Sequence, residues 1–170
     1  MEFIDLAKSR YSVRKFKNDS VPEDIVNKIL EVAKVSPSAC NNQPVKIYVL
    51  ESNEAREKLK KCTNCHFNAP LAFIVCYDTN TCWNRPFDNK NSGDVDASIV
   101  TTHMMLEAYS LGIGSTWVMF FDPEVLVKEL NIPSNIVPVS ILPMGFPSDD
   151  SVPSPKHSSF KDMNDMVIKL

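Results

Sequence analysis

Helix-type and strand-type hydrophobic patterns alternate along this chain, yet no glycine-rich turn follows the first strand-type run, residues 45–50. A doubly wound dinucleotide-binding sheet carries a G-x-G-x-x-G turn at that point, and a P-loop needs its own pattern of glycines and lysine. The chain has four glycines and neither motif. The alternation therefore argues against a nucleotide-binding doubly wound sheet and favours another fold built from both helices and strands.

The spacing of apolar residues, together with turn and capping residues, places the expected elements. Helices are expected at residues 3–8, from a Ser20–Glu23 capping box to just before Pro37, at 55–61, at 94–111, from Asp122-Pro123 to about Leu130, and at 160–170. Strands are expected at residues 45–50, 71–77, 115–121 and 136–142. Residues 78–93 show no periodicity and are expected to form a long loop.

The length of 170 residues fits one ordinary domain, which can bury a core without disulfides or a structural metal. No linker or internal repeat divides the chain, so we expect a single domain over residues 1–170. The composition, 44% hydrophobic and 23% charged, is typical of soluble globular proteins. No apolar run approaches the roughly 18 residues of a membrane span, so we expect no membrane partner.

The charge pattern indicates a small ligand and a cytoplasmic location. Glu2 and Asp5 stand where a secretory signal would be basic and then apolar. A net charge of -3 and a pI near 5.6 argue against nucleic acid or anionic lipid as the main partner. The five cysteines are an odd number, and Cys76 lies in a strand-type run, so a reducing cytosol fits better than a disulfide framework.

Cys62 and Cys65 form a lone CxxC motif after a lysine-rich helix. A zinc site usually has a second pair of ligands, and a thioredoxin-like motif follows a strand, so we interpret these cysteines as incidental thiols. His103 lies inside the longest helical pattern and is interpreted as a histidine whose ring is satisfied within the helix. We expect no metal site.

Three polar clusters could carry chemistry, and the first is Arg10, Ser12 and Arg14, next to Tyr11. Two guanidinium groups and a hydroxyl that alternate along five residues can converge on a dianionic group such as a phosphate. A solvated basic patch after a short helix would show the same spacing.

The second cluster is the loop of residues 36–44, which contains Pro37, Ser38, Asn41 and Gln43. Its side chains both donate and accept hydrogen bonds, as the edge of a flat heteroaromatic ring requires. A helix-to-strand connection that satisfies its own backbone would have a similar composition.

The third cluster is Pro143-Met144-Gly145, directly after the fourth expected strand. Gly145 would allow the backbone to approach a ligand closely, and a simple turn is an equal alternative.

Four ordered segments of the chain resemble the signatures of the nitroreductase family. Residues 10–16, RYSVRKF, are similar to R-x-S-[VI]-R-x-[FY], and residues 36–44, SPSACNNQP, contain a loop similar to P-S-x-x-N-x-Q-P. Residues 111–117, LGIGSTW, and 142–147, LPMGFP, are similar to the G-L-G-S-x-W and L-P-x-G-[YF]-P segments. Each motif is weak alone, but the ordered set covers residues 10–147.

This resemblance implies an α+β fold, a nitroreductase-like central mixed sheet with flanking helices, in an intertwined homodimer with two FMN sites at the subunit interface. Arg10, Tyr11, Ser12 and Arg14 would bind around the FMN phosphate. The partner subunit would supply the loop side of the site, and the last strand would line the isoalloxazine. The implied loop and strand residues are Pro37, Ser38, Ala39, Asn41, Gln43, Pro143, Met144 and Gly145.

The chain departs from the family pattern at two points. The family usually has a basic residue, often Arg, just before the C-terminal helix, whereas this chain has Pro155-Lys156-His157 there. Lys156 or His157 would then substitute near the phosphate. A tryptophan commonly follows the Q-P pair, and here Val45 takes its place.

The function implied is hydride transfer from NAD(P)H through FMN to a small oxidant such as a nitroaromatic or quinone, by a ping-pong mechanism. We name no catalytic side chain, because the flavin would perform the chemistry. One alternative is a family member with other flavin chemistry, such as dehydrogenation or dehalogenation. Another is a non-catalytic flavin-binding or sensor protein.

Overall fold

A four-stranded sheet lies at the centre of the protein in the computed structural model, which describes residues 2–170; Met1, part of the expected domain, is outside them. The strands are β1 (Val45–Leu50), β2 (Leu71–Asp78), β3 (Gly114–Ser115) and β4 (Ile136–Gly145), in the order β1-β2-β4-β3. All three strand pairs are antiparallel. The expectation of a mixed sheet is therefore wrong for the paired strands. Within residues 2–170 the parallel pairing is one isolated bridge, between Ser12 and Ser115.

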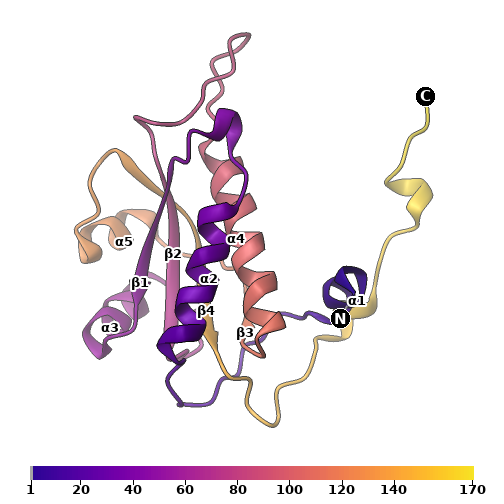
Figure 1. Ribbon diagram of the computed structural model, residues 1–170. Helices are drawn as coiled ribbons and strands as arrows, with labels where there is room; N and C mark the ends of the chain where they lie inside the picture. Colours follow the sequence, from indigo (N-terminus) through magenta and orange to yellow (C-terminus); the bar gives the residue numbers. More distant parts are fainter. Residues whose placement is uncertain (1) are drawn as a thin grey trace.

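Five helices surround this sheet, as Figure 1 shows. They are α1 (Phe3–Ser9), α2 (Glu23–Val35), α3 (Asn53–Cys62), α4 (Gly93–Ser110) and α5 (Pro123–Leu130). Short 3-10 helices occur at Ala39–Asn41, Pro155–Ser158 and Met163–Asp165. No helix within residues 2–170 combines the length and apolarity needed to cross a membrane.

Strand β2 is covered on both faces, because its residues 71–77 are all buried. Alternate side chains of a strand point to opposite faces. Phe73 and Val75 pack in the core that includes α2 and α4, whereas Ile74 and Cys76 pack in the core that includes α3 and α5. The result is three layers, with two helices on each face of the sheet.

The longest helix, α4, confirms the expected helix at residues 94–111 within one residue at each end. Ala97, Val100, Met104 and Ala108 of the predicted stripe are buried in the α2 core. The helix ends before Gly112, whose φ of 78° is easy for a residue without a side chain.

Helix starts were predicted with mixed success. At α5, the Asp122 carboxylate accepts hydrogen bonds from the backbone N–H groups of Glu124 and Val125, so the predicted cap is confirmed. At α2, the expected capping box is wrong. The helix begins at Glu23 with Pro22 as its N-cap residue, and no side chain caps it.

Two expected elements are largely absent. Of the strand expected at residues 115–121, only Ser115 belongs to β3, and Val118 adds a single bridge to Ile141 before the chain turns toward α5. Of the helix expected at residues 160–170, only the turn Met163–Asp165 forms. Residues 158–170 are exposed and extend away from the core (Figure 1), so no packing supports a helix there.

Residues 78–93 project from one end of the sheet as a hairpin-like excursion (Figure 1). The backbone N–H of Ser92 donates to the carbonyl of Trp83 at 2.9 Å, and that of Arg85 donates to the carbonyl of Lys90 at 3.0 Å. These bonds give order to a segment for which the sequence predicted only a loop.

Candidate functional site

The first cluster, residues 10–14, lies along the free edge of β3. Arg10 ends α1 with extended backbone, and the N–H of Val13 donates to the carbonyl of Ser115 at 2.9 Å. Val13 is buried, and a Cβ added to Gly114 would lie 2.7 Å from the Val13 side chain. Close packing of Val13 on Gly114 therefore fixes the backbone that carries the two arginines.

The guanidinium groups of this cluster are available to a ligand. Arg14 is exposed, and its Nη1 donates to the carbonyl of Ser12 at 3.3 Å, which holds the side chain beside the Ser12 backbone. Within residues 2–170, neither Arg10 nor Arg14 forms an ion pair with a carboxylate. Two unpaired guanidinium groups flanking a hydroxyl fit a phosphate by charge and by hydrogen-bond geometry.

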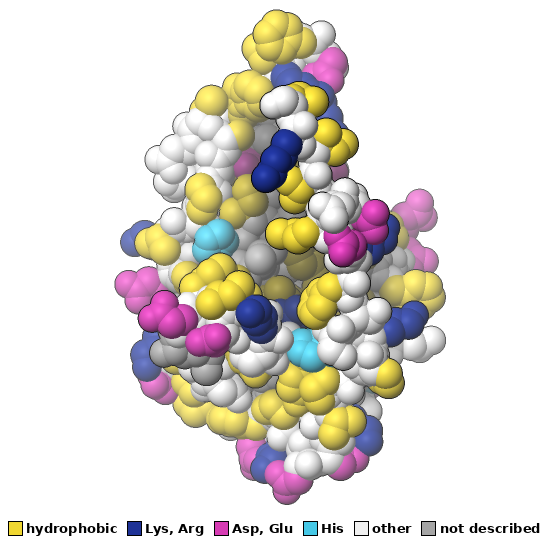
Figure 2. Space-filling model, turned by 90° about the vertical axis from the view of Figure 1, so that its right-hand side faces the viewer, with side chains coloured by type: hydrophobic (Ala, Val, Ile, Leu, Met, Phe, Trp, Pro, Cys, Tyr) yellow, Lys and Arg dark blue, Asp and Glu magenta, His cyan; other side chains and the backbone are white. Residues whose placement is uncertain are grey.

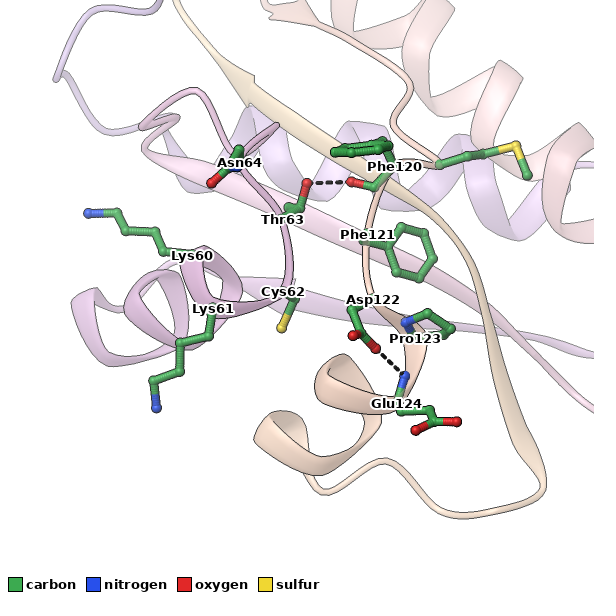
Figure 3. A pocket seen from close by; sticks show the side chains of 11 residues that line it. Lys60, Lys61, Cys62, Thr63, Asn64, Phe120, Phe121, Asp122, Pro123 and Glu124 are labelled. Atoms are coloured by element: carbon green, nitrogen blue, oxygen red, sulfur yellow. Dashed lines mark hydrogen bonds between the residues drawn. The ribbon is translucent and has the colours of Figure 1, made fainter.

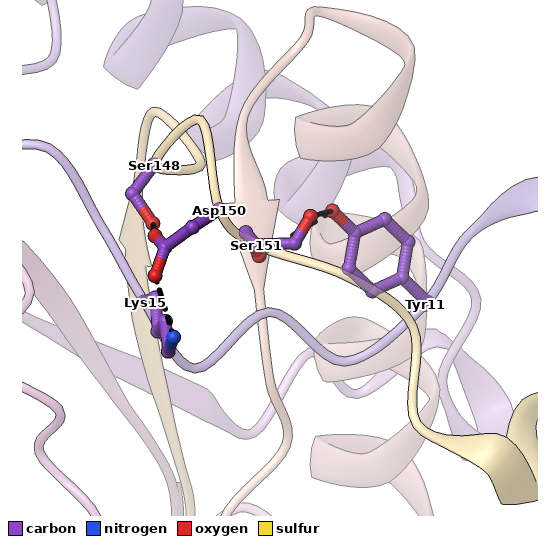
Figure 4. A network of polar contacts seen from close by, with 5 residues as sticks. All are labelled: Tyr11, Lys15, Ser148, Asp150 and Ser151. Carbon is purple, nitrogen blue, oxygen red and sulfur yellow. Dashed lines mark hydrogen bonds and ion pairs between the residues drawn. The ribbon is translucent and has the colours of Figure 1, made fainter.

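The neighbouring lysines, in contrast, already have partners. Lys15 pairs with Asp150 at 2.6 Å and Lys17 pairs with Asp149 at 2.7 Å, as Figure 4 shows for the first pair. Lys15 holds the pKa of the Asp150 carboxyl below its usual value, and the Ser148 hydroxyl, which donates to it at 2.7 Å, adds to the effect. These contacts fasten the start of the C-terminal segment to residues 15–17. Of the basic side chains at positions 10–17, Arg10 and Arg14 are the two without a carboxylate partner in the described part of the chain.

The C-terminal segment also brings one of the two expected basic substitutes to the cluster. The His157 ring packs edge-on against the Tyr11 ring, with 6.3 Å between the ring centroids. The Tyr11 hydroxyl in turn donates to the carbonyl of Ser151 at 3.3 Å (Figure 4). Lys156 is exposed, and no side-chain contact ties it to the first cluster within the described residues. Of this pair, the structure places His157 beside the predicted phosphate residues.

The second cluster is an ordered loop between α2 and β1. The Ser38 hydroxyl accepts from the Gln43 N–H at 2.9 Å, and the Asn41 Oδ1 accepts from Gln43 Nε2 at 3.0 Å. Part of its polar character thus serves the loop itself, as the alternative interpretation expected. Pro37, Asn41 and Gln43 remain exposed, and Ser38 and Ala39 are half-buried.

This loop has strained backbone that its surroundings hold in place. Cys40, Asn41 and Gln43 have φ values of 51°, 54° and 50°, a region that costs residues with side chains about 1–3 kcal/mol each. The Ala39 N–H donates to the Asp96 carboxylate at 2.9 Å, and Asp96 on α4 is almost completely buried. Sequence reasoning missed Asp96, because an acidic residue in the first turn of a helix is ordinary.

One chain does not bring the two clusters together. The loop is tied to Asp96, near the start of α4, whereas the Tyr109 hydroxyl, near the end of α4, donates to the carbonyl of Ser9 beside the first cluster. With a rise of 1.5 Å per residue, Asp96 and Tyr109 lie about 20 Å apart along the helix. The loop and the arginines therefore lie at opposite ends of the molecule.

The third cluster belongs to the buried end of β4. Pro143, Met144 and Gly145 are all buried, and Met144 packs in the α2–α4 core. A Cβ at Gly145 would lie 2.7 Å from the Pro70 ring, so close packing accounts for this glycine without a ligand. Because its side chains are buried, this segment can meet a ligand only through its backbone, and the role predicted for Gly145 stays a prediction.

A groove that the sequence did not predict lies beyond β3 (Figure 3). It has a volume of about 680 Å³ between the end of α3 and the segment that leads to α5. Met119 and Phe120 line it with 72% and 76% of their surface exposed, and the Thr63 hydroxyl donates to the carbonyl of Phe120. The chain reaches this groove four residues after Ser115, which pairs with Ser12. Two exposed apolar side chains therefore lie four and five residues along the chain from the strand residue that pairs with the arginine cluster.

The remaining candidate groups have structural roles. Burial raises the pKa of the Cys62 thiol, which donates to the carbonyl of Lys58 at 3.3 Å, and burial raises the pKa of Cys76 to about 12. His103 Nδ1 bonds to the carbonyl of Ile99 at 2.8 Å, as expected for a satisfied helix histidine. No group of three or more potential metal ligands occurs in the part of the chain that the structure describes.

The antiparallel sheet with two helices on each face defines an α+β protein, and its family follows from comparison with known proteins. The model of the Nitroreductase family matches residues 7–73 and 66–146, and the chain belongs to this family.

Individual relatives agree with this assignment. A relative from Methanothermobacter thermautotrophicus, named a candidate NADH dehydrogenase/NAD(P)H nitroreductase, is 32% identical over 88% of this chain and 80% of its own length. The FMN reductase [NAD(P)H] of Bacillus subtilis is 24% identical over 91% of this chain and 70% of its own length. The crystal structure of a nitroreductase family protein from Clostridium difficile 630 is 39% identical, covers 99% of this chain and 98% of its own, and has a TM-score of 0.94.

Proposed function

We propose that this protein, an FMN-dependent NAD(P)H oxidoreductase, passes hydride to a small oxidant such as a nitroaromatic or a quinone, with both substrates using one flavin face in turn. The observation that carries the proposal is the pair of unpaired guanidinium groups, Arg10 and Arg14, on a rigid edge of a nitroreductase-family fold. The FMN reductase of Bacillus subtilis supports the cofactor. We propose that residues 1–170 act as one domain in the cytoplasm.

The phosphate end of the cofactor site is the better supported half. Arg10 and Arg14 would bind the phosphate, with the Ser12 hydroxyl between them and the His157 ring beside Tyr11. The aspartates that neutralise Lys15 and Lys17 keep those lysines occupied, so the phosphate would meet the two arginines.

The ring end would lie toward the groove beyond β3. Met119 and Phe120 offer an exposed apolar surface, which a flat ring needs on at least one face. When bound, FMN supplies the hydride chemistry, accepting hydride from the nicotinamide and giving it to the oxidant. The protein's own residues would bind, orient and shield the reactants.

We propose that a second copy of the chain completes the site. The loop of residues 36–44 lies at the far end of α4 from the arginine cluster of the same chain, so both can line one flavin only if the loop comes from a partner. Helix α4 has an apolar surface on its outer face as well, where Val95 and Ile99 line a hollow of about 460 Å³. A helix that is apolar on both faces is usually covered on both.

The C-terminal segment supports the same proposal. Phe160, Met163, Val167 and Ile168 are exposed on a segment that leaves the core (Figure 1), and hydrophobic side chains surround a hollow on the face seen in Figure 2. Strand β1 is an edge of the sheet, so its outer hydrogen-bonding groups are open to another strand. An intertwined homodimer would cover these apolar surfaces.

The decisive experiment is an absorbance spectrum of the purified protein, before and after anaerobic addition of NADH or NADPH. We expect an oxidised-flavin spectrum that bleaches with at least one nicotinamide and returns when a quinone or nitroaromatic is added. Steady-state rates with both substrates varied should give parallel double-reciprocal lines. The proposal would be overturned if neither NADH nor NADPH reduced the flavin, or if the protein bound no FMN.

A further inference from the structure

A second cavity, separate from the groove beyond β3, lies on the other side of α3. Its volume is about 180 Å³, and its polar lining comes from α3, from the turn before β2 and from Asn18. The basic residues that line it are Arg56, Lys60 and His66, and the amide side chains are Asn18, Asn53 and Asn68. Lys60 lines both cavities, and in Figure 3 its side chain points away from Phe120 and Phe121.

Arg56 contributes a buried donor that the protein does not use. Its Nη2 donates to Asn53 Oδ1, one turn earlier in α3. Its Nε is buried and has no hydrogen-bond partner among residues 2–170. The Nε is too enclosed for a ligand to reach, but a guanidinium has five N–H donors and the bond to Asn53 uses one of them, so Arg56 keeps further donors for a ligand in the cavity that it lines.

The charges around the cavity favour an anion. Glu57 is the acidic residue in the lining, and it is paired with Lys60 at 2.7 Å. Arg56 has no carboxylate partner within the described residues, so the lining keeps a net positive charge. Burial lowers the pKa of His66, the positive charge of Lys60 lowers it further, and Glu57 opposes them. His66 is therefore mostly neutral at pH 7.

The neutral His66 ring still presents a donor. Its Nδ1 accepts from the Asn68 N–H at 3.0 Å, so the ring proton lies on Nε2. With Arg56, Lys60 and the amide groups of the asparagines, donors reach the cavity from three separate segments of the chain. Such a set suits a small oxyanion with several acceptor oxygens better than a planar apolar ligand.

We propose that this cavity binds a phosphate dianion, at a site distinct from the arginine cluster assigned to FMN. Two sources share this chemistry: inorganic phosphate, and the 2′-phosphate that distinguishes NADPH from NADH. Asn18 follows Arg14 by four residues, so the cavity lies within about 14 Å of chain from the proposed FMN phosphate site. Asn18 therefore ties one edge of the cavity to the chain segment that carries Arg14.

The first test uses inorganic phosphate as the probe and the FMN-loaded protein, so that the arginine cluster is filled. Phosphate should shift the His66 ring resonances saturably and raise the His66 pKa, because a bound dianion favours the imidazolium. Arg56→Met should weaken this binding about tenfold or more, since it removes a charge-assisted donor. Lys58→Met is the matched control: it changes the same helix and breaks an ion pair to Glu54 outside the cavity. No phosphate-dependent shift, or equal binding by the Arg56→Met protein, would overturn the proposal.

The second test separates the two sources and rests on the proposed function. If the 2′-phosphate occupies the cavity, Arg56→Met should lower kcat/KM for NADPH about tenfold and leave that for NADH unchanged, and Lys58→Met should change neither. Unchanged kinetics together with a phosphate-dependent His66 shift would assign the cavity to inorganic phosphate. Failure of the proposed function would look different, because the unsubstituted protein would then turn over neither nicotinamide while His66 still responded to phosphate.

Discussion

The buried carboxylate of Asp96 accepts a hydrogen bond from the backbone N–H of Ala39 at 2.9 Å. The other carboxylate oxygen accepts from the Ser92 hydroxyl at 2.6 Å. One residue of α4 therefore ties the end of the hairpin-like excursion to the loop that follows α2. Because three residues of that loop have left-handed backbone, this tie offsets part of the strain in the loop.

Asp96→Ala should lower the free energy of unfolding by about 2–3 kcal/mol, because it removes two hydrogen bonds to a buried charge. It should also weaken FMN binding, if the loop contacts the flavin across the dimer. Urea unfolding of the apoprotein and FMN titration measure the two effects. Ser92→Ala is the control, since it removes one of the bonds and leaves Ala39 tied. Reduced stability with unchanged FMN affinity would mean that the loop does not touch the flavin.

Gly145→Ala should destabilise the protein by about 1–3 kcal/mol, because the added Cβ would lie 2.7 Å from the Pro70 ring in a packed core. Gly112→Ala is the comparison. Apart from Gly112 and its chain neighbours, no atom of the described residues lies within 4 Å of a Cβ at this position, so its φ of 78° should be the main cost, about 1 kcal/mol. A Gly145→Ala protein with normal stability and lost FMN affinity would instead support the interpretation that Gly145 lets the backbone approach a ligand closely.

The sequence predicted most of the fold because its strongest signals are local. The stripe of α4 and the Asp122 cap of α5 depend on residues within one or two turns, and both are present in the structure. Residues 115–121 look like a strand by composition. In the described chain, however, Val118 adds only a single bridge to Ile141 of β4 after Ser115, because the chain then turns toward α5. The extent of β3 depends on its pairing register with β4, and this register cannot be read from a single sequence.

The candidate site was predictable only where one motif holds the chemistry. The arginine cluster is local, and neither of its guanidinium groups pairs with a carboxylate among residues 2–170. Asp96 was not predictable, since its role depends on a contact with Ala39, 57 residues away. The close packing of Gly145 on Pro70 was not predictable for a similar reason, because Pro70 reaches it through the pairing of β2 with β4.

Arg14→Ala should weaken FMN binding about 10–100-fold, because it removes charge-assisted hydrogen bonds worth roughly 1.5–3 kcal/mol. Titration of the apoprotein with FMN, followed by flavin fluorescence, measures this. Lys28→Ala on α2 is the control, since it removes an exposed cation that pairs only loosely with Asp24, at 3.6 Å. Equal FMN affinity of both variants would mean that residues 10–14 form a solvated basic patch and do not bind the phosphate.

The stability of the protein should fall as the pH drops below about 6.5, partly through His66. Burial lowers the pKa of this group in the folded state from its ordinary 6.5, so the unfolded chain binds its proton first. The neutral ring contributes stability above pH 6.5, and that contribution is lost as the pH falls toward the folded-state pKa. Urea unfolding between pH 7.5 and 5.5 should show a shallower decline for His66→Gln, and an NMR titration should give a His66 pKa below 6.5. A pKa above 6.5 in phosphate-free buffer would contradict the assignment.

Replacing two exposed apolar residues of the C-terminal segment should have two effects at once: the subunits should separate, and FMN should be released. Val167 and Ile168 are 48% and 85% exposed in the single chain, and neither belongs to the hydrophobic core of residues 2–170. If the partner subunit covers them, Val167→Asp with Ile168→Asp would bury two carboxylates, a cost that a dimer interface does not tolerate without partners. Sedimentation equilibrium should then show a monomer, and the monomer should retain little FMN because it lacks the partner's loop.

Lys161→Ala with Lys169→Ala alters the same segment without touching its apolar side chains, and it should leave the dimer intact. A dimer that survives the two aspartates would place the interface elsewhere, and a monomer that keeps FMN would refute the shared site.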